Sequence, residues 1–240
     1  RQDADTQQLI ANMEASLRAM QDLLEGLLDV SKLDAGAVPV HFRAVALGDL
    51  FAQLQSSAVL SAEDKGLRLR VCATQAKVMS DPTLLLRILM NLLANAVRYT
   101  SVGTVMLACR CSADGRWAHI EVRDSGIGIA PEHQSLIFKE FYQVGNSERD
   151  RSKGMGLGLN IVQRTAQLLS HELSMVSAPG CGTRFRLTVP MAPPNALTTV
   201  AEALPPSFAD DLGHVTVLVV EDDVLARAGI VALMASWGVQ

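Results

Sequence analysis

Two asparagines near the middle of the chain lie on a segment that is otherwise apolar. Asn91 and Asn95 are four residues apart, a spacing that places both carboxamides on one face of a helix. Such groups need buried partners or a ligand, and an amide oxygen can coordinate a hard cation such as Mg2+. Arg98 and Tyr99 follow near the helix end, where they can reach phosphate oxygens and a nucleotide. Bonding to nearby backbone would explain either asparagine alone, but it explains this set of residues poorly.

A second group of residues directly follows a run typical of a strand. Its sequence is Asp124-Ser125-Gly126-Ile127-Gly128-Ile129. The glycines allow a tight turn and close approach of the backbone to a ligand, and the acid can accept a hydrogen bond from an exocyclic amine. An ordinary turn between a strand and a loop uses the same residues, so this pattern alone is a weak signal.

A third group of residues opens a helix with alternating glycines. Its sequence is Gly154-Met155-Gly156-Leu157-Gly158-Leu159. The unpaired N–H groups and the dipole of a helix start favour phosphate. A Rossmann site would place this turn after the first strand of a βαβ unit, with an acid about twenty residues on. Here the turn comes late and follows the polar stretch 145–153, although the glycines alone do not separate dinucleotide from mononucleotide sites.

The segment from Val45 to Val189 must supply the elements that hold these groups. A helix is expected over Leu50–Leu60, and another begins at Pro82 with Asp81 as its cap. A third helix follows Gly158. Strands are predicted over Leu67–Cys72, Thr104–Cys111, Trp117–Arg123 and Thr183–Val189, with a hairpin joining the middle two. We therefore expect an α+β layer with helices on one face of the sheet, in which Cys109 and Cys111 are packing residues and not metal ligands.

In their order and spacing, the three groups resemble the N, G1 and G2 boxes of the histidine-kinase type of GHKL ATP-binding domain. Between them, Phe138-Lys139-Glu140-Phe141-Tyr142 resembles the F box, and Gly180-Cys181-Gly182-Thr183 resembles the final glycine turn of the family. The resemblance covers roughly residues 40–190. It implies a two-layer α/β sandwich, the Bergerat fold, with ATP and Mg2+ as cofactors.

The resemblance also implies a role for each matching residue. Asn95 would bind Mg2+, Asp124 would read the adenine amino group, and the glycines after position 153 would wrap the phosphates, with 145–153 as the ATP lid. The predicted nucleotide-binding residues are Asn91, Asn95, Arg98, Tyr99, Asp124, Gly126, Gly128, Ile129, Lys153, Gly154, Met155, Gly156, Leu157, Gly158, Leu159 and Thr183.

The segments on either side of this region resemble two further parts of a hybrid sensor histidine kinase. Residues 7–34 carry an apolar heptad seam that ends at Gly36 and Pro39, formed by Ile10, Met13, Leu17, Met20, Leu24 and Leu27. This helix resembles the second helix of a dimerisation and phosphotransfer hairpin; an amphipathic helix on the core of its own domain is the alternative. After a proline-rich linker, the strand beginning at Val215 and the acids Glu221 and Asp222 resemble the first βα unit and the Mg2+ pair of a flavodoxin-like receiver.

Four segments follow from these resemblances: the hairpin helix (1–37), the ATP-binding domain (38–191), a linker (192–213) and the start of a receiver (214–240). The implied activity transfers the γ-phosphoryl group of ATP to a hairpin histidine and then to a receiver aspartate. The implied partners are a second copy, bound through the hairpin helices, and the receiver of the same chain or of a separate response regulator. None of His41, His119, His133, His171 and His214 stands in an H box. We therefore expect both phosphoacceptors to lie outside these 240 residues, in a longer protein.

Composition narrows the classes of partner. The formal net charge of −4 offers no basic surplus for nucleic acid. No apolar tract reaches the ~20 residues that span a bilayer, so membrane attachment is expected only through segments before Arg1. Four cysteines without a CxxC pair indicate a reducing compartment. We expect a cytoplasmic location, or the cytoplasmic part of an inner-membrane sensor.

Two other functions remain open. ATP-hydrolysing GHKL proteins of the gyrase, mismatch-repair and chaperone kinds have a water-activating Glu four residues before the Mg2+-binding Asn. Here that position is Asn91, an amide that cannot act as a base, which disfavours hydrolysis. The other alternative is a nucleotide-binding scaffold without catalysis, and the presence or absence of an H box upstream would decide it.

Overall fold

The computed structural model describes residues 30–144 and 156–193, the positions 13, 17, 20, 24, 26–28 of an N-terminal helix, and residues 227, 231 and 234. The chain divides into two compact units, Arg1–Thr198 and Thr199–Gln240. All strands and helices labelled below belong to the first unit. The predicted linker and receiver, with Glu221 and Asp222, fall almost entirely outside the described residues.

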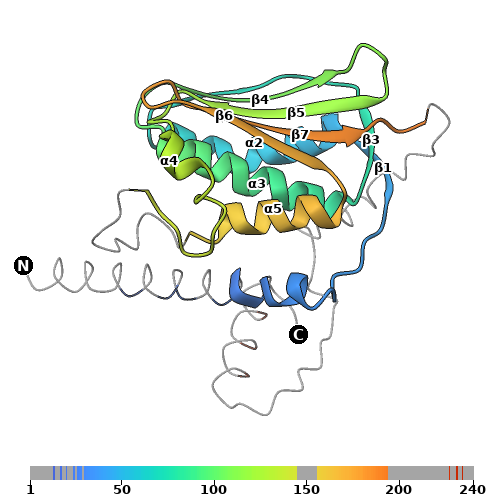
Figure 1. Ribbon diagram of the computed structural model, residues 1–240, viewed down its shortest axis with the longest axis horizontal. Coiled ribbons are helices and arrows are strands. Elements are labelled where there is room, and N and C mark those ends of the chain that lie inside the picture. The colour runs from blue at the N-terminus through green and yellow to red at the C-terminus, as the bar shows by residue number, and fades with distance from the viewer. Residues whose placement is uncertain are drawn as a thin grey trace, which may run out of the picture. The chain divides into compact units, whose positions relative to one another are not determined.

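A five-stranded sheet forms one layer of the first unit (Figure 1). Its strands lie in the order β2-β4-β5-β7-β6, and only the β2–β4 pair is parallel. A separate antiparallel pair joins β1 and β3. The bounds are β1 Arg43–Ala46, β2 Arg68–Val71, β3 Lys77–Ser80, β4 Thr104–Cys111, β5 Trp117–Asp124, β6 Glu172–Ser177 and β7 Thr183–Pro190.

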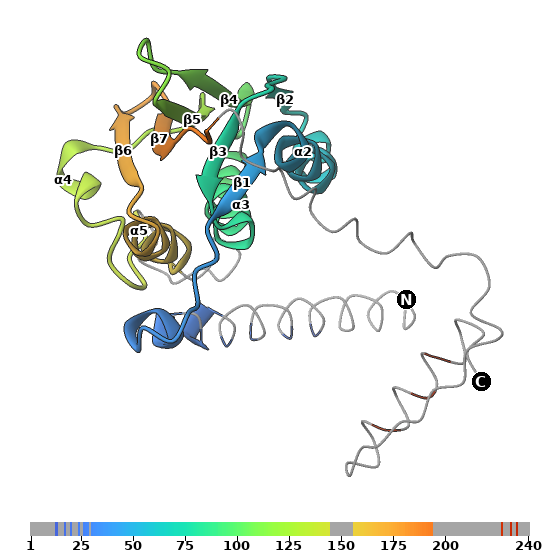
Figure 2. The ribbon, with the colours of Figure 1, turned by 90° about the vertical axis from the view of Figure 1, so that its right-hand side faces the viewer.

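Three helices form the second layer and cover one face of this sheet (Figures 1 and 2). They are α2 (Leu47–Glu63), α3 (Pro82–Tyr99) and α5 (Gly158–Leu168), and a short α4 (Pro131–Gln134) follows β5. The Asp81 carboxylate caps α3 by accepting from the N–H groups of Thr83 at 2.9 Å and Leu84 at 3.0 Å. The apolar stripe of α3 then packs under the sheet.

Strand alternation places the core on the helix side of the sheet. In β7, Phe185, Leu187 and Val189 are buried, whereas the residues between them are half-exposed on the other face. The helices contribute Leu54, Leu85, Leu89 and others to the same core. Sheet and helices therefore share one apolar interior, and the opposite face of the sheet carries mainly polar side chains.

The predicted α+β layers are confirmed, and so are most of the predicted elements. β4 has the expected bounds, Asp81 caps α3, and α2 extends a few residues beyond the prediction at both ends. The prediction that both cysteines are packing residues is confirmed for Cys109, which packs against the core, and is wrong for Cys111, which is exposed near the end of β4. Within the described ranges, His, Cys, Asp and Glu form no group of three that could hold a metal.

Four short elements were not predicted: β1, β3, α4 and β6. β1, β3 and α4 have four residues each, too few to show a period. β6 lies at the sheet edge and buries none of its residues fully, and Val176-Ser177 reverses the alternation of polar and apolar residues that its first four residues show.

The N-terminal helix ends at Asp34, and a turn at Gly36 follows, as predicted. Val30 and Leu33 of this helix pack against Leu157 and Ile161. The Asp34 carboxylate pairs with Arg164 of α5. Five predicted seam residues, Met13, Leu17, Met20, Leu24 and Leu27, are exposed, and Ile10 lies outside the described residues. No helix in the described part of the chain is long and apolar enough to cross a membrane.

Candidate nucleotide site

A cavity of about 290 Å³ lies between α3, the loop after β5, the start of α5 and the start of β7. It brings together residues that are far apart in the sequence. The predicted site residues that line it are Asn91, Asn95, Arg98, Tyr99, Asp124, Gly128, Ile129, Gly156, Leu157, Gly158, Leu159 and Thr183. The volume is close to the lower end of the range for small-molecule pockets.

Four predicted nucleotide-binding residues are not among the residues that line the cavity. Gly126 is not among the lining residues, but its N–H donates to Asp124 at 2.9 Å. Lys153, Gly154 and Met155 lie outside the described residues. The structure adds lining residues that were not predicted: Gly26, Ala94, Ala96, Ile127, Ile137, Tyr142, Gln143, Val144, Ile161 and Phe185. Tyr142 belongs to the F-box pattern. The apolar residues have no sequence pattern that marks them as site residues, because only the fold brings them together.

The two asparagines face the start of α5. Asn91 Nδ2 donates to the carbonyl of Arg87 at 3.0 Å, so backbone bonding does account for one end of this amide. Its Oδ1 points toward Gly158, where an added Cβ would lie 2.9 Å from it. Asn95 Nδ2 would lie 3.9 Å from the same Cβ. A side chain at position 158 would therefore press on the face of α3 that carries both carboxamides.

The start of α5 contributes backbone N–H groups to the lining of the cavity. No side chain caps this end of the helix, and the first N–H groups of a helix have no partner within it. The helix dipole adds positive potential at the same place. Beside two carboxamides and Arg98, this helix start suits the oxygens of a polyphosphate.

Asp124 lies at the end of β5 with one oxygen already engaged. Its Oδ1 accepts from the N–H of Gly126 at 2.9 Å and from that of Thr183 at 3.2 Å. No donor in the described part of the chain reaches Oδ2. Burial raises the pKa of this carboxyl, and the two backbone donors act against that rise. The second oxygen is available to a donor on a ligand.

The loop after β5 is held against the turn between β6 and β7. Gly128 has φ +68°, and a Cβ there would lie 1.9 Å from the carbonyl oxygen of Ala178. The carbonyl of Ile127 accepts from the N–H of Gly180 at 2.7 Å, and the N–H of Ile129 donates to Ser177 Oγ at 2.8 Å. These contacts fix the loop, and only glycine fits at position 128.

The segment 138–144 is tied to α5 and α4. Asn160 Nδ2 donates to the carbonyl of Phe138 at 2.9 Å, and the Tyr142 hydroxyl lies 2.7 Å from His133 Nδ1. The N–H of Phe141 donates to the carbonyl of Gly156 at 3.1 Å. This segment therefore packs beside the start of α5, and it contributes Tyr142, Gln143 and Val144 to the lining of the cavity.

The donor set fits a cation that is shared with a ligand. Asn95 supplies an amide oxygen, and no hydrogen bond to its side chain is formed within the described ranges. Mg2+ commonly takes one or two protein oxygens and completes its shell with water and substrate phosphates. The cavity fits that mode better than a cage built from protein groups alone.

Comparison with known proteins agrees with this geometry. Residues 80–193 match the family described as histidine kinase-, DNA gyrase B-, and HSP90-like ATPase. The aerobic respiration control sensor protein ArcB of Escherichia coli (strain K12) is 31% identical over 226 residues, which are 91% of this chain and 28% of ArcB. The virulence sensor protein BvgS of Bordetella bronchiseptica is 34% identical over 204 residues, which are 81% of this chain and 16% of BvgS.

A solved structure of the same kind supports the fold. The crystal structure of full-length ShkA in complex with AMPPNP matches with a TM-score of 0.64 and 26% identity, covering 94% of this chain and 46% of that one. The chain thus spans less than a third of the length of the two sensor proteins it resembles. The domain that bears the cavity belongs to the histidine kinase-, DNA gyrase B- and HSP90-like ATPase family and is similar to the catalytic domain of sensor histidine kinases.

Proposed function

We propose that the cavity binds ATP with Mg2+ and that the longer protein transfers the γ-phosphoryl group to a histidine of a helical hairpin, and then to a receiver aspartate. One observation is the main support for a nucleotide site in this cavity. The asparagine pair, the Asp124 carboxylate and the start of α5 converge on one cavity from distant parts of the chain. The complex of ShkA with AMPPNP supports an adenine nucleotide as the ligand.

The lining of the cavity has chemistry suited to both the adenine and the phosphates of ATP. Oδ2 of Asp124 would accept from the adenine amino group, because Oδ1 is already engaged by the Gly126 and Thr183 N–H groups. Asn95 and the start of α5 would hold the metal and the phosphates, with Lys153, Gly154 and Met155 as further contacts. Bound Mg2+ supplies charge neutralisation on the transferred group.

Asn91 favours transfer over hydrolysis. A general base that activates water must accept a proton, and a carboxamide cannot do so at neutral pH. In the family, ATP-hydrolysing members have a Glu at this position. We therefore expect turnover of ATP by the 240-residue chain to be close to background.

The remaining parts of the proposal concern the whole protein. Residues 1–37 would be the second helix of the hairpin, 38–191 the ATP-binding domain, 192–213 a linker and 214–240 the start of a receiver with Glu221 and Asp222 as its Mg2+ pair. The hairpin helices would form the homodimer, and the receiver would be the phosphotransfer partner. Membership in the sensor kinase family supports this arrangement.

Titration calorimetry with ATP and GTP in the presence of Mg2+ tests the site. Asn95→Ala should weaken Mg2+-ATP binding at least tenfold, and Asp124→Ala should reduce the preference for ATP over GTP. The exposed residues Gln53 and Asp64 offer matched controls, since Gln53→Ala and Asp64→Ala remove the same kinds of group elsewhere. Unchanged affinity and selectivity in both site variants would overturn the assignment.

Labelling with γ-labelled ATP tests the transfer reaction. The chain should bind nucleotide without labelling itself, because none of its five histidines has the H-box setting. A polypeptide that also contains the first hairpin helix should acquire acid-labile, base-stable phosphate on the added histidine. Acid-labile label on the 240 residues alone would reveal an acceptor among the existing histidines, and rapid ATP turnover would indicate a hydrolase.

A further inference from the structure

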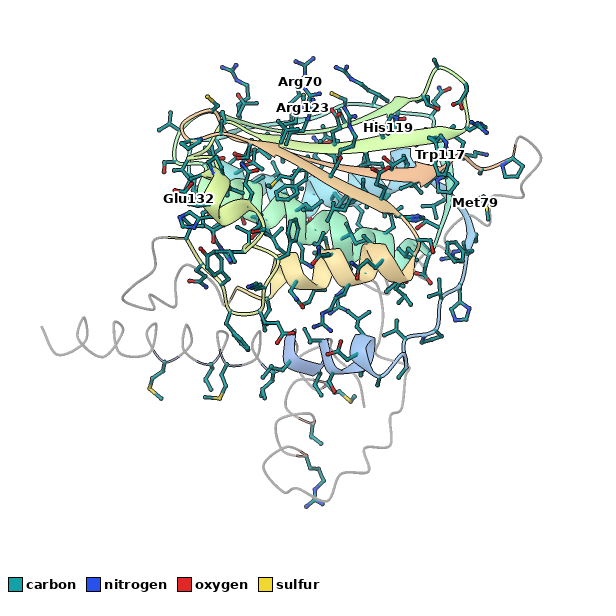
Figure 3. The ribbon with its side chains drawn as sticks, in the orientation of Figure 1. Arg70, Met79, Trp117, His119, Arg123 and Glu132 are labelled. Atoms are coloured by element: carbon teal, nitrogen blue, oxygen red, sulfur yellow. The ribbon has the colours of Figure 1, made fainter. Side chains whose placement is uncertain are left out.

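The face of the five-stranded sheet opposite the helices carries a row of side chains that crosses every strand. Arg70, Met106, Arg123, Arg184 and Val176 are neighbours in register on β2, β4, β5, β7 and β6. Paired residues point to the same side of a sheet, so these side chains share one face. Figure 3 shows Arg70 and Arg123 on the side that faces away from the helices.

Alternation along the strands adds further arginines to this face. We call the surface the arginine face and define it by Arg68, Arg70, Arg110, Arg123, Arg184 and Arg186, with Glu121 and Glu172 as its acids. Six cations against two anions contrast with the formal net charge of −4 for the chain. All six cations are arginines, and the face contains no lysine.

The centre of the arginine face already holds a carboxylate. Glu121 is 1% exposed, and its Oε1 accepts from Arg186 Nε at 2.8 Å while its Oε2 accepts from Arg123 Nε at 2.9 Å. Burial by itself would raise the pKa of Glu121, but the hydrogen bonds from Arg186 and Arg123 bring the net shift below the ordinary value. The spacing of guanidinium groups on this face therefore suits an ionised carboxylate.

The other four arginines have no such partner. Within residues 30–144 and 156–193, no acid pairs with Arg68, Arg70, Arg110 or Arg184. Arg184 also stands directly opposite Arg123 in register, and like charges in that position destabilise a sheet. Glu121 compensates the charge of Arg123, but no acid within the described ranges compensates that of Arg184. A local arrangement that opposes stability is typical of a functional surface.

We propose that the arginine face docks an acidic surface of a partner protein. The planar guanidinium group matches carboxylates in bidentate geometry, which a lysine ammonium cannot do. Trp117 lies in register with Pro190 at one end of the face and is 40% exposed. Arginine and tryptophan are the residues that most often dominate binding energy in protein interfaces.

Binding of a 20-residue poly-L-glutamate peptide to the 240-residue chain at low salt tests this proposal. The double charge reversal Arg70→Glu/Arg110→Glu should weaken peptide binding at least tenfold. The matched control Lys32→Glu/Arg43→Glu changes two exposed cations outside the arginine face and should leave binding within twofold. A milder pair, Arg68→Gln/Arg110→Gln, should show a smaller loss in the same direction if the first variant fails to fold.

Three results would overturn the proposal. The first is no binding of poly-L-glutamate, and the second is an equal loss in the control variant, which would reflect net charge alone. The third is preferential binding of phosphatidylglycerol vesicles or duplex DNA through the same arginines, which would assign the face to a phosphate surface. ATP affinity measured on every variant should stay unchanged, so that failure here is distinguishable from failure of the nucleotide site.

Discussion

At the residue scale, the loop after β5 depends on a glycine whose replacement can be tested cleanly. Gly128→Ala should reduce the free energy of unfolding by about 2–4 kcal/mol, because it combines a left-handed φ with a Cβ at 1.9 Å from the Ala178 carbonyl oxygen. Gly180→Ala is a matched control, since Gly180 has φ +72° with no atom within 4 Å of the added Cβ. That variant should lose about 1 kcal/mol.

Urea denaturation of the two variants measures the difference. It isolates the steric contact, because both substitutions carry a similar backbone strain. Equal losses in the two variants would show that the loop moves away from the β6–β7 turn at little cost. In that case the close approach at Gly128 would not be what fixes the loop beside Asp124.

A buried histidine makes stability depend on pH. His171 is 5% exposed and its Nε2 lies 2.9 Å from Ser80 Oγ. Burial lowers the pKa of His171 to about 4 from an ordinary 6.5. The unfolded chain therefore takes up a proton at this histidine between pH 6.5 and 4 while the folded chain does not, so stability falls as pH decreases through that window.

The expected loss between pH 7 and pH 4.5 is on the order of 2 kcal/mol, allowing for partial solvent access to the ring. Urea denaturation at the two pH values should show it. In His171→Gln, which keeps a polar group beside Ser80 but does not titrate, the decrease should be smaller by that amount. The same pH dependence in wild type and variant would assign the effect to the carboxylates.

Most of the polar residues that line the cavity could be predicted from the sequence, because each belongs to a local pattern. Asn91, Asn95, Asp124 and the glycines of the turns are unusual for the segments in which they stand. Their order and spacing can therefore be recognised in the sequence before the fold is known. Ile137 and Phe185 also line the cavity, but an apolar residue in an amphipathic pattern looks the same whether it meets the core or a ligand. The hydrogen bond from the Thr183 N–H to Asp124 Oδ1 joins residues 59 positions apart, so it also could not be predicted without the fold.

At the element scale, the start of α3 is fixed by one side chain. Asp81 Oδ1 accepts from the N–H groups of Thr83 and Leu84, and its Oδ2 accepts from the N–H of His41 at 2.9 Å. Asp81→Ala should lower the free energy of unfolding by about 1–2 kcal/mol. Asp81→Asn should lose less, because the amide oxygen can keep the cap while the amide nitrogen cannot accept from His41.

Thermal or urea unfolding of the two Asp81 variants provides the measurement. If Asp81→Asn and Asp81→Ala are equally unstable, the bond to His41 rather than the cap is the main contribution. Because α3 carries the asparagine pair, we also expect the Ala variant to bind Mg2+-ATP more weakly at temperatures where the first turn of α3 frays.

Elements with a clear period or cap could be predicted, and those defined by long-range pairing could not. The Asp81-Pro82 start of α3 and the alternation of β7 are readable in the sequence alone. The four-residue strands β1 and β3 exist because they pair with each other across more than thirty residues of chain. The parallel pairing of β2 with β4, which places Arg68 and Arg70 beside the other arginines, is a property of topology.

At the scale of the whole molecule, net charge proves to be a poor guide to local charge. The formal value of −4 predicts no affinity for anions, yet strand register collects six arginines on one face of the sheet. Those arginines are spread over more than a hundred positions of the sequence. Their common face could be found only after the strand order and register were known.

The seam of the N-terminal helix leads to a prediction about association. Met13, Leu17, Met20 and Leu24 are each more than half exposed, and a 3–4 spacing of apolar residues favours packing against another helix. We expect the chain to self-associate through this seam. In sedimentation velocity, the mean sedimentation coefficient should rise with protein concentration, and Leu17→Glu should abolish the rise by placing a charge in the centre of the seam.

Leu60→Glu is the control, because Leu60 is 69% exposed on α2, away from the seam. It adds the same charge and removes the same apolar side chain, so a loss of association in both variants would point to general apolar contact between molecules. A concentration-independent monomer for the wild type would rule out association through the seam in these 240 residues. Association lost only in Leu17→Glu would identify the N-terminal helix as the dimerising element, as the proposed hairpin requires.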